Sequence, residues 1–127
     1  KVSKAVNDRI ETKNLETFIT LQKTMQDIDH EFPLQYSICL AEIALNPGIT
    51  LTGLSEQAAM PLSTVSRIVG ALSKNRQKGK PFGLVKTVTP PEERRRKLLY
   101  LTKSGEKLIE KLENILDANI PQQKKSA

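Results

Sequence analysis

The residues best suited to chemistry lie on one side of a short segment in the middle of the chain, residues 62–75. This segment contains serine, arginine and lysine but no aspartate or glutamate. At about 100° per residue, a helix here gathers four aliphatic side chains on one face: Val65, Ile68, Val69 and Leu72. The opposite face carries small or cationic residues, with Ser66 at its edge: Ser63, Arg67, Gly70 and Lys74. The segment therefore predicts an amphipathic helix with a carboxylate-free outer face.

Such a face suits contact with base edges in a DNA major groove. Small side chains let a helix sit deep in a groove about 12 Å wide, and serine and arginine donate hydrogen bonds to base edges. An arginine can bind guanine through O6 and N7 together. The alternative is a helix whose polar side only meets water, but that kind of face usually carries Glu–Lys pairs, and this segment has no acidic residue.

A second group of cations, Arg94, Arg95 and Arg96, follows two prolines and two glutamates. It lies between two β-prone segments, residues 84–88 and 97–101, which predicts the tip of a β-hairpin. Narrow DNA grooves attract inserted arginine side chains, and one of the glutamates is expected to pair with an arginine and hold the tip in shape. Three lysines are expected to contact phosphates, which position a protein on DNA without reading its sequence: Lys78, Lys80 and Lys86.

The net charge of the 127-residue chain is +6, and it is unevenly distributed. Residues 67–97 carry ten Lys or Arg against two Glu. Residues 1–66 carry five Lys or Arg against eight acidic residues, and residues 98–127 carry five against four. A basic middle segment between acidic or neutral flanks is typical of a protein that meets a polyanion on one face. The alternative is a solvated, lysine-rich loop.

Apolar spacing and turn signals predict the elements that position these residues. A long helix is expected over residues 1–31, ended by Pro33. A second helix, over residues 34–45, is expected to carry one apolar face: Leu34, Ile38, Ala41 and Leu45. Asn46-Pro47-Gly48 is a turn signal. A short helix over residues 52–59 and a break at Met60-Pro61 precede the helix over residues 62–75, which together make a helix-turn-helix.

A last helix is expected from Lys103 to about residue 119, with Thr102 as its N-cap. The element order predicts a mainly α fold with a small β-hairpin wing, which is the winged helix-turn-helix plan. We expect a DNA-binding domain over residues 32–102 between an N-terminal helix (1–31) and a C-terminal helix and tail (103–127). The apolar stripes of these end helices need a partner to cover them, and the residues expected at dimerisation are Phe18, Leu21, Met25, Leu112, Ile115 and Leu116.

Other residue types point away from catalysis, metal binding and membranes. The single cysteine, Cys39, lies among aliphatic residues with no nearby cation, so core packing is expected rather than redox sensing. The single histidine, His30, lacks the further nitrogen or sulfur ligands of a transition-metal site. No cofactor motif or catalytic constellation is found in the sequence. The lone cysteine, the charged N-terminal region and the lack of a long apolar stretch favour a cytoplasmic protein.

Several runs together resemble the multiple-antibiotic-resistance regulator (MarR) family of winged helix-turn-helix proteins. The resemblance covers about residues 32–112, and Pro47-Gly48 before the helix-turn-helix also fits it. In the helix-turn-helix, the matching runs are Thr50-Leu51-Thr52-Gly53-Leu54-Ser55-Glu56-Gln57-Ala58 and Ser63-Thr64-Val65-Ser66-Arg67-Ile68-Val69. In the wing and the last helix, they are Gly83-Leu84-Val85, Glu93-Arg94-Arg95 and Leu101-Thr102-Lys103-Ser104-Gly105.

The resemblance implies a homodimer joined through its N- and C-terminal helices and bound to a palindromic operator in double-stranded DNA. Each subunit would place the helix over residues 62–75 in a major groove and the wing, residues 84–101, in the adjacent minor groove. Family members mostly repress transcription and often release DNA when a small-molecule effector binds or a cysteine is oxidised. By position, the resemblance assigns base-reading contacts to Ser63, Thr64, Ser66 and Arg67, and the wing arginines to Arg94 and Arg95.

Two other classes remain open from the sequence. One is a winged-helix module that binds protein, and the other is a non-specific architectural nucleic-acid binder. A protein-binding face should expose apolar or aromatic anchors, and Ser63, Ser66 and Gly70 offer none. The sequence therefore favours a sequence-specific transcriptional regulator.

Overall fold

The computed structural model describes residues 12–74 and 80–118, and the chain divides into two compact units. One unit comprises residues 31–109, and the other comprises the described parts of residues 1–30 and 110–127. A single helix, α6 (Lys103–Ala118), runs through the boundary between residues 109 and 110. Among the described helices, none combines the length and the apolar character that a membrane span requires.

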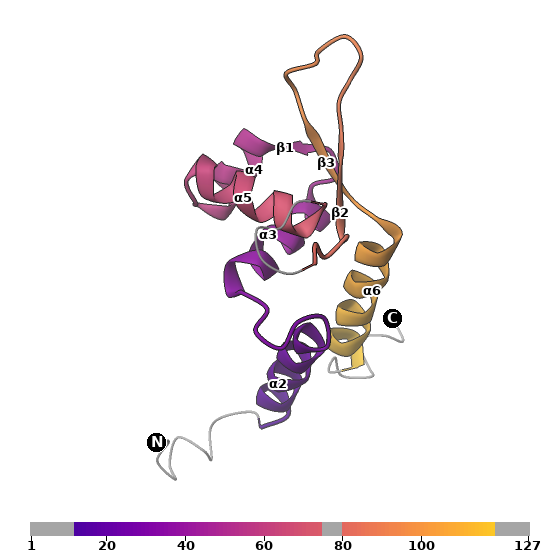
Figure 1. Cartoon of the computed structure of the whole chain (residues 1–127). Helices are drawn as coiled ribbons and strands as arrows, with labels where there is room; N and C mark the ends of the chain where they lie inside the picture. The colour runs from indigo at the N-terminus through magenta and orange to yellow at the C-terminus, as the bar shows by residue number, and fades with distance from the viewer. Residues whose placement is uncertain (1–11, 75–79, 119–127) are drawn as a thin grey trace. The chain divides into compact units, whose positions relative to one another are not determined.

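The unit of residues 31–109 packs helices against a small antiparallel sheet (Figure 1). Besides the start of α6, its helices are α3 (Leu34–Leu45), α4 (Leu51–Ala58) and α5 (Leu62–Leu72). Its strands are β1 (Ile49–Thr50), β2 (Val85–Val88) and β3 (Leu98–Leu101), in the spatial order β1-β3-β2. The expected mainly α fold with a β-hairpin wing is therefore confirmed.

The core of this unit is aliphatic, as a sequence with 4% aromatic residues requires. Helices α3, α4 and α5 and strand β3 contribute fully buried side chains: Leu40, Ile43, Leu54, Val65, Ile68, Leu72 and Leu99. Burying one such side chain stabilises a fold by roughly 1.5–3 kcal/mol. The four residues predicted for the inner face of α5 are all among the buried residues, with exposures of 5% or less.

The sheet has one strand more than the sequence predicted. β2 and β3 form the expected hairpin, with Val85 opposite Leu101 and Val88 opposite Leu98. β1 adds to the other edge of β3, where Ile49 lies opposite Leu99. Two residues are too few to show the alternation by which a strand is recognised in a sequence.

The apolar face predicted for α3 is on the surface of the described chain. Leu34, Ile38 and Leu45 are 70%, 38% and 77% exposed, and Ala41 is also exposed. The helix keeps its predicted bounds but buries Cys39, Leu40 and Ile43 instead. Because α3 carries apolar residues on most of its circumference, their spacing does not determine which side meets α4 and α5.

The first helix ends earlier than expected. The described part of the N-terminal region forms α2 (Thr12–Gln26), so the helix stops five residues before Glu31. The backbone tightens at this point, since the N–H of Ile28 donates to the carbonyl of Met25. Three acidic residues follow, Asp27, Asp29 and Glu31. Negative charge at a helix C-terminus is unfavourable, which explains why the helix does not continue to Pro33.

The backbone N–H and carbonyl of Leu84 connect α5, the wing and α6. Its N–H donates to the carbonyl of Leu72, the last residue of α5, at 2.7 Å, and its carbonyl accepts from the N–H of Thr102 at 3.0 Å. The Thr102 hydroxyl donates to the Gly83 carbonyl at 2.7 Å and accepts from the N–H of Gly105 at 3.1 Å. The predicted N-cap of the last helix is therefore confirmed.

Gly105 allows α6 to approach Leu84 this closely. The residue is buried, and a Cβ atom at this position would overlap the Leu84 carbonyl oxygen and lie 3.3 Å from the Leu101 Cβ. The obstacle is backbone, which cannot rotate away as a flexible side chain can. Packing therefore explains two residues of the run 101–105: the hydroxyl of residue 102 caps α6, and the glycine at residue 105 leaves room for the Leu84 carbonyl.

We predict that Gly105→Ala destabilises the protein by about 1–3 kcal/mol, because the added methyl group displaces the Leu84 carbonyl from its bond with Thr102. Urea unfolding of both proteins measures the change. Ser104→Ala, at an exposed neighbouring position, is the matched control and should stay within about 0.5 kcal/mol of the unaltered chain. Equal stability of Gly105→Ala and the control would contradict this packing account.

Candidate nucleic-acid interface

The turn of the helix-turn-helix consists of Ala59, Met60 and Pro61. The Thr50 hydroxyl caps α4 by accepting from the N–H of Gly53 at 3.0 Å. Ala59 ends α4 in the left-handed conformation, with φ 55° and ψ 48°. Its N–H and that of Met60 return to carbonyls in the last turn of α4. This tight turn fixes the direction in which α5 leaves α4.

The outer face of α5 is polar and cationic, as predicted. Ser63, Ser66 and Arg67 are exposed, while Gly70 and Thr64 are partly exposed. The reverse of the same helix is buried in the core, so the outer face cannot turn inward without exposing that core. From Leu62 to Leu72 the helix contains no carboxylate.

α5 is shorter than predicted and ends at Leu72 rather than near residue 75. The Ser73 hydroxyl donates to the Val69 carbonyl at 2.7 Å, which competes with the helical pattern. The N–H groups of Phe82 and Leu84 then take the carbonyls of Ala71 and Leu72. Lys74 is exposed but lies beyond the helix, so it is not on the reading face expected from a longer helix.

The wing projects past the helices of its unit, with residues 89–97 at its tip (Figure 1). All of its cations are exposed. Within the tip, the Arg96 guanidinium lies 3.3 Å from the Glu93 carboxylate, and the N–H of Arg96 donates to the Glu93 carbonyl. Arg96 is thus the arginine that pairs with a glutamate.

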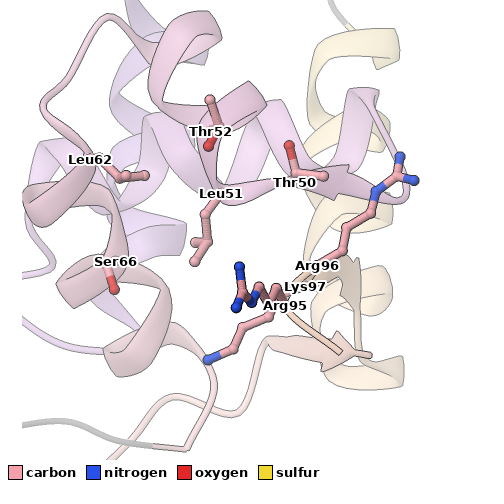
Figure 2. A pocket seen from close by; sticks show the side chains of 8 residues that line it. All are labelled: Thr50, Leu51, Thr52, Leu62, Ser66, Arg95, Arg96 and Lys97. Carbon is pink, nitrogen blue, oxygen red and sulfur yellow. The ribbon is translucent and has the colours of Figure 1, made fainter. Parts of the chain in front are cut away.

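An open hollow of about 420 Å³ lies between the wing and the helix-turn-helix. Figure 2 shows the wing residues Arg95, Arg96 and Lys97 among the side chains that line it. Residues of β1, α4 and α5 complete the lining: Thr50, Leu51, Thr52, Leu62 and Ser66. Cationic residues of the wing and hydroxyl-bearing residues of β1, α4 and α5 therefore line the same hollow, together with two leucines.

Sequence reasoning had not placed Thr50 or Thr52 in the site, whereas it placed Lys97 beside Arg96 at the start of the descending strand of the wing. The two threonines lie at the start of α4. They reach the hollow only because β1 pairs with β3 and brings the start of α4 beside the descending strand of the wing. The sequence contains no local signal for this approach.

Of the three lysines predicted to contact phosphates, two lie within the described residues. Lys80 and Lys86 are exposed, and Lys86 lies opposite Tyr100 in the β2–β3 ladder. Lys78 lies outside the described residues. Near Lys80, the ring of Phe82 packs against Phe32 and Tyr36, with ring centroids 5.0 and 6.0 Å away. This aromatic cluster, which sequence reasoning missed, joins the segment before β2 to the start of α3.

Cys39 is in the core, as predicted, with no exposed surface. Burial, and to a lesser degree the Glu42 carboxylate, raise the pKa of its thiol to about 11. A thiol with this pKa stays protonated at neutral pH, and the thiolate is the form that reacts. The environment of Cys39 therefore opposes a redox role.

The residues predicted for dimerisation differ in how much surface they offer. Phe18 and Leu116 are 57% and 46% exposed, and Leu15 and Ile19 on α2 are also exposed. Leu21, Leu112 and Ile115 are partly buried. Met25 is only 7% exposed in the single chain, so it has little surface left for a partner.

Comparison with known proteins identifies the fold. No family model matches the sequence, and no curated protein matches it. Among solved structures, a complex of S. aureus MepR with DNA superposes with a TM-score of 0.70 at 19% identity, covering 89% of this chain and 86% of that one. A mutant of E. coli MarR complexed with operator DNA gives a TM-score of 0.59 at 19% identity, covering 89% and 74%.

The PcaV transcriptional regulator of Streptomyces coelicolor, in complex with its natural ligand, gives a TM-score of 0.54 at 20% identity, covering 91% of this chain and 80% of that one. The chain has the winged helix-turn-helix fold of these proteins. The resemblance to the MarR family is thereby confirmed at the level of the fold, since MarR itself is among the matched structures.

We predict that Cys39 in the folded protein reacts far more slowly with a thiol reagent at pH 8 than an exposed cysteine does. Burial limits access, and the raised pKa leaves roughly a hundredfold less thiolate. The matched control is the double variant Cys39→Ser with Ser104→Cys, which moves the single thiol to an exposed site. Similar rates for the two proteins would contradict the buried, protonated thiol.

Proposed function

We propose that the protein is a sequence-specific transcriptional regulator that binds double-stranded DNA. The observation that carries this proposal is the carboxylate-free outer face of α5, which projects beside a hollow lined by Arg95 and Lys97. A DNA duplex offers base edges to the outer face of α5 and phosphates to the cations in the hollow. Two of the structures that share the fold are complexes with DNA, which supports this direction.

In this proposal α5 enters the major groove. Ser63, Ser66 and Arg67 contact base edges, and Arg67 has the guanidinium geometry that guanine O6 and N7 accept. Thr64, which is partly exposed, lies at the margin of this face. Lys74, Lys80 and Lys86 contact phosphates, where they add affinity without specificity.

The wing meets the adjacent minor groove in this arrangement. Arg94 is at its exposed tip, where the potential of a narrow groove attracts cations, whereas Arg95 lines the hollow. Lys97 and Arg95 together hold the DNA backbone that passes between the wing and α5. Arg96, paired with Glu93, shapes the tip and contributes less.

We further propose a homodimer that acts as a repressor on a palindromic operator and responds to a small-molecule effector. Exposed apolar side chains on two helices support assembly: Leu15, Phe18 and Ile19 of α2 and Leu116 of α6. Covering apolar surface that is exposed to water lowers the free energy, which favours association. A two-fold symmetric protein matches a two-fold symmetric site. The activity requires no catalysis, metal or cofactor.

We predict that Arg67→Ala weakens binding to the cognate site by about fivefold to 150-fold, because a bidentate arginine–guanine contact contributes roughly 1–3 kcal/mol. The cognate site is obtained by selecting bound sequences from a random duplex pool. Binding to unselected duplexes should hardly change. Lys23→Ala, which removes one exposed cation from α2, is the charge-matched control. Unchanged cognate binding by Arg67→Ala would contradict the base-reading role.

We predict that the double variant Arg95→Ala with Lys97→Ala weakens binding to all duplexes. It should also reduce the slope of log affinity against log salt by about 1.8, or roughly 0.9 for each lost phosphate contact. Lys13→Ala with Lys23→Ala, which removes two exposed cations from α2, is the charge-matched control. An equal loss of slope in the control would show that the hollow has no special part in binding.

A further inference from the structure

The hollow beside α5 contains an exposed leucine among cations and hydroxyls. Leu62 is the first residue of α5 and is 49% exposed. It lines the hollow together with Ser66, Arg95 and the half-buried Leu51 (Figure 2). Single exposed leucines are common on protein surfaces, so the position of Leu62, rather than its exposure alone, calls for a role.

We propose that Leu62 is a specificity-determining residue that contacts the C5-methyl group of a thymine in the operator. This inference rests on the proposed DNA-binding function and assigns part of the base sequence that it recognises. Thymine alone among the four bases presents a methyl group in the major groove. An apolar side chain at the start of a reading helix is a suitable partner, because residues at the N-terminus of such a helix contact base edges.

The geometry of α5 separates this contact from the polar ones. At about 100° per residue, Leu62 lies about 40° from Ser66 and about 140° from Arg67 around the helix axis. Leu62 therefore faces the wing side of the reading surface, where Arg95 and Lys97 line the hollow. The thymine methyl group lies on the side of the base nearer to its own backbone. If the hollow holds the phosphates of that backbone, the Leu62 side chain beside them is well placed to contact the thymine methyl group.

The neighbours of Leu62 favour a base methyl group over a protein segment as its partner. Leu51 and Leu62 are the only apolar residues that line the hollow, and the others are cationic or carry a hydroxyl group: Thr50, Thr52, Ser66, Arg95, Arg96 and Lys97. A protein-binding pocket needs larger apolar or aromatic anchors. DNA complements both kinds of residue, because its phosphates suit the cations and a thymine methyl group suits the leucines.

The test replaces each thymine of the selected operator, one at a time, by deoxyuridine, which removes only the methyl group. The unaltered protein should bind about fourfold more weakly when one particular thymine of a half-site is replaced, which is the effect of one buried methyl group. Leu62→Ala should bind the thymine operator correspondingly more weakly and show no further loss with deoxyuridine at that position. Leu62→Met, which keeps an apolar side chain, should retain the sensitivity.

Leu34→Ala is the matched control, because Leu34 is an exposed leucine at the start of α3 and does not line the hollow; it should keep the full sensitivity to deoxyuridine. Thermal unfolding checks that the variants are folded. Two results would overturn the inference: Leu62→Ala retaining the deoxyuridine effect, or the unaltered protein showing none at any thymine. If a specific operator is selected, these results leave the proposed function standing. If no operator is selected, the proposed function and this inference both fail.

Discussion

The backbone of one residue, Leu84, constrains the parts of the molecule that would meet DNA. Its N–H satisfies the last carbonyl of α5 and its carbonyl satisfies the backbone of Thr102 at the start of α6. Buried backbone groups without partners are costly, so the end of α5, the base of the wing and the first turn of α6 cannot separate freely. Gly105 is required there because its lack of a side chain makes room for the same carbonyl.

The two faces of α5 have different tasks: the inner face holds the helix in place, and the outer face is the one that would read base edges. The inner face of α5 is held by aliphatic packing, with Val65, Ile68 and Leu72 fully buried. Its outer face, by contrast, is free of the intrahelical ion pairs that carboxylates would form. Side chains that are not engaged within the protein are available to base edges. The wing has the opposite arrangement, since its Glu93–Arg96 pair uses one cation to shape the tip while Arg95 and Lys97 line the hollow.

The sequence was sufficient for features that depend on local spacing. It predicted the two faces of α5, the bounds of α3, the cap at Thr102 and the burial of Cys39, because each follows from a helical period or a short motif. The sequence was not sufficient for features that depend on contacts between segments far apart in the chain. α5 stops at Leu72 because the N–H groups of Phe82 and Leu84, about ten residues later, take its last carbonyls. The exposed side of α3 depends on where α4 and α5 pack, and the hollow depends on the pairing of β1 with β3.

The central claim is that the outer face of α5 and the wing side of the hollow receive a DNA duplex. Amide chemical shifts, recorded by NMR with and without a selected operator duplex, test this most directly. The account predicts that the largest changes fall in residues 62–72 and 93–97, while the exposed side of α3, from Leu34 to Leu45, changes little. Large changes on α3 with α5 unaffected would contradict it.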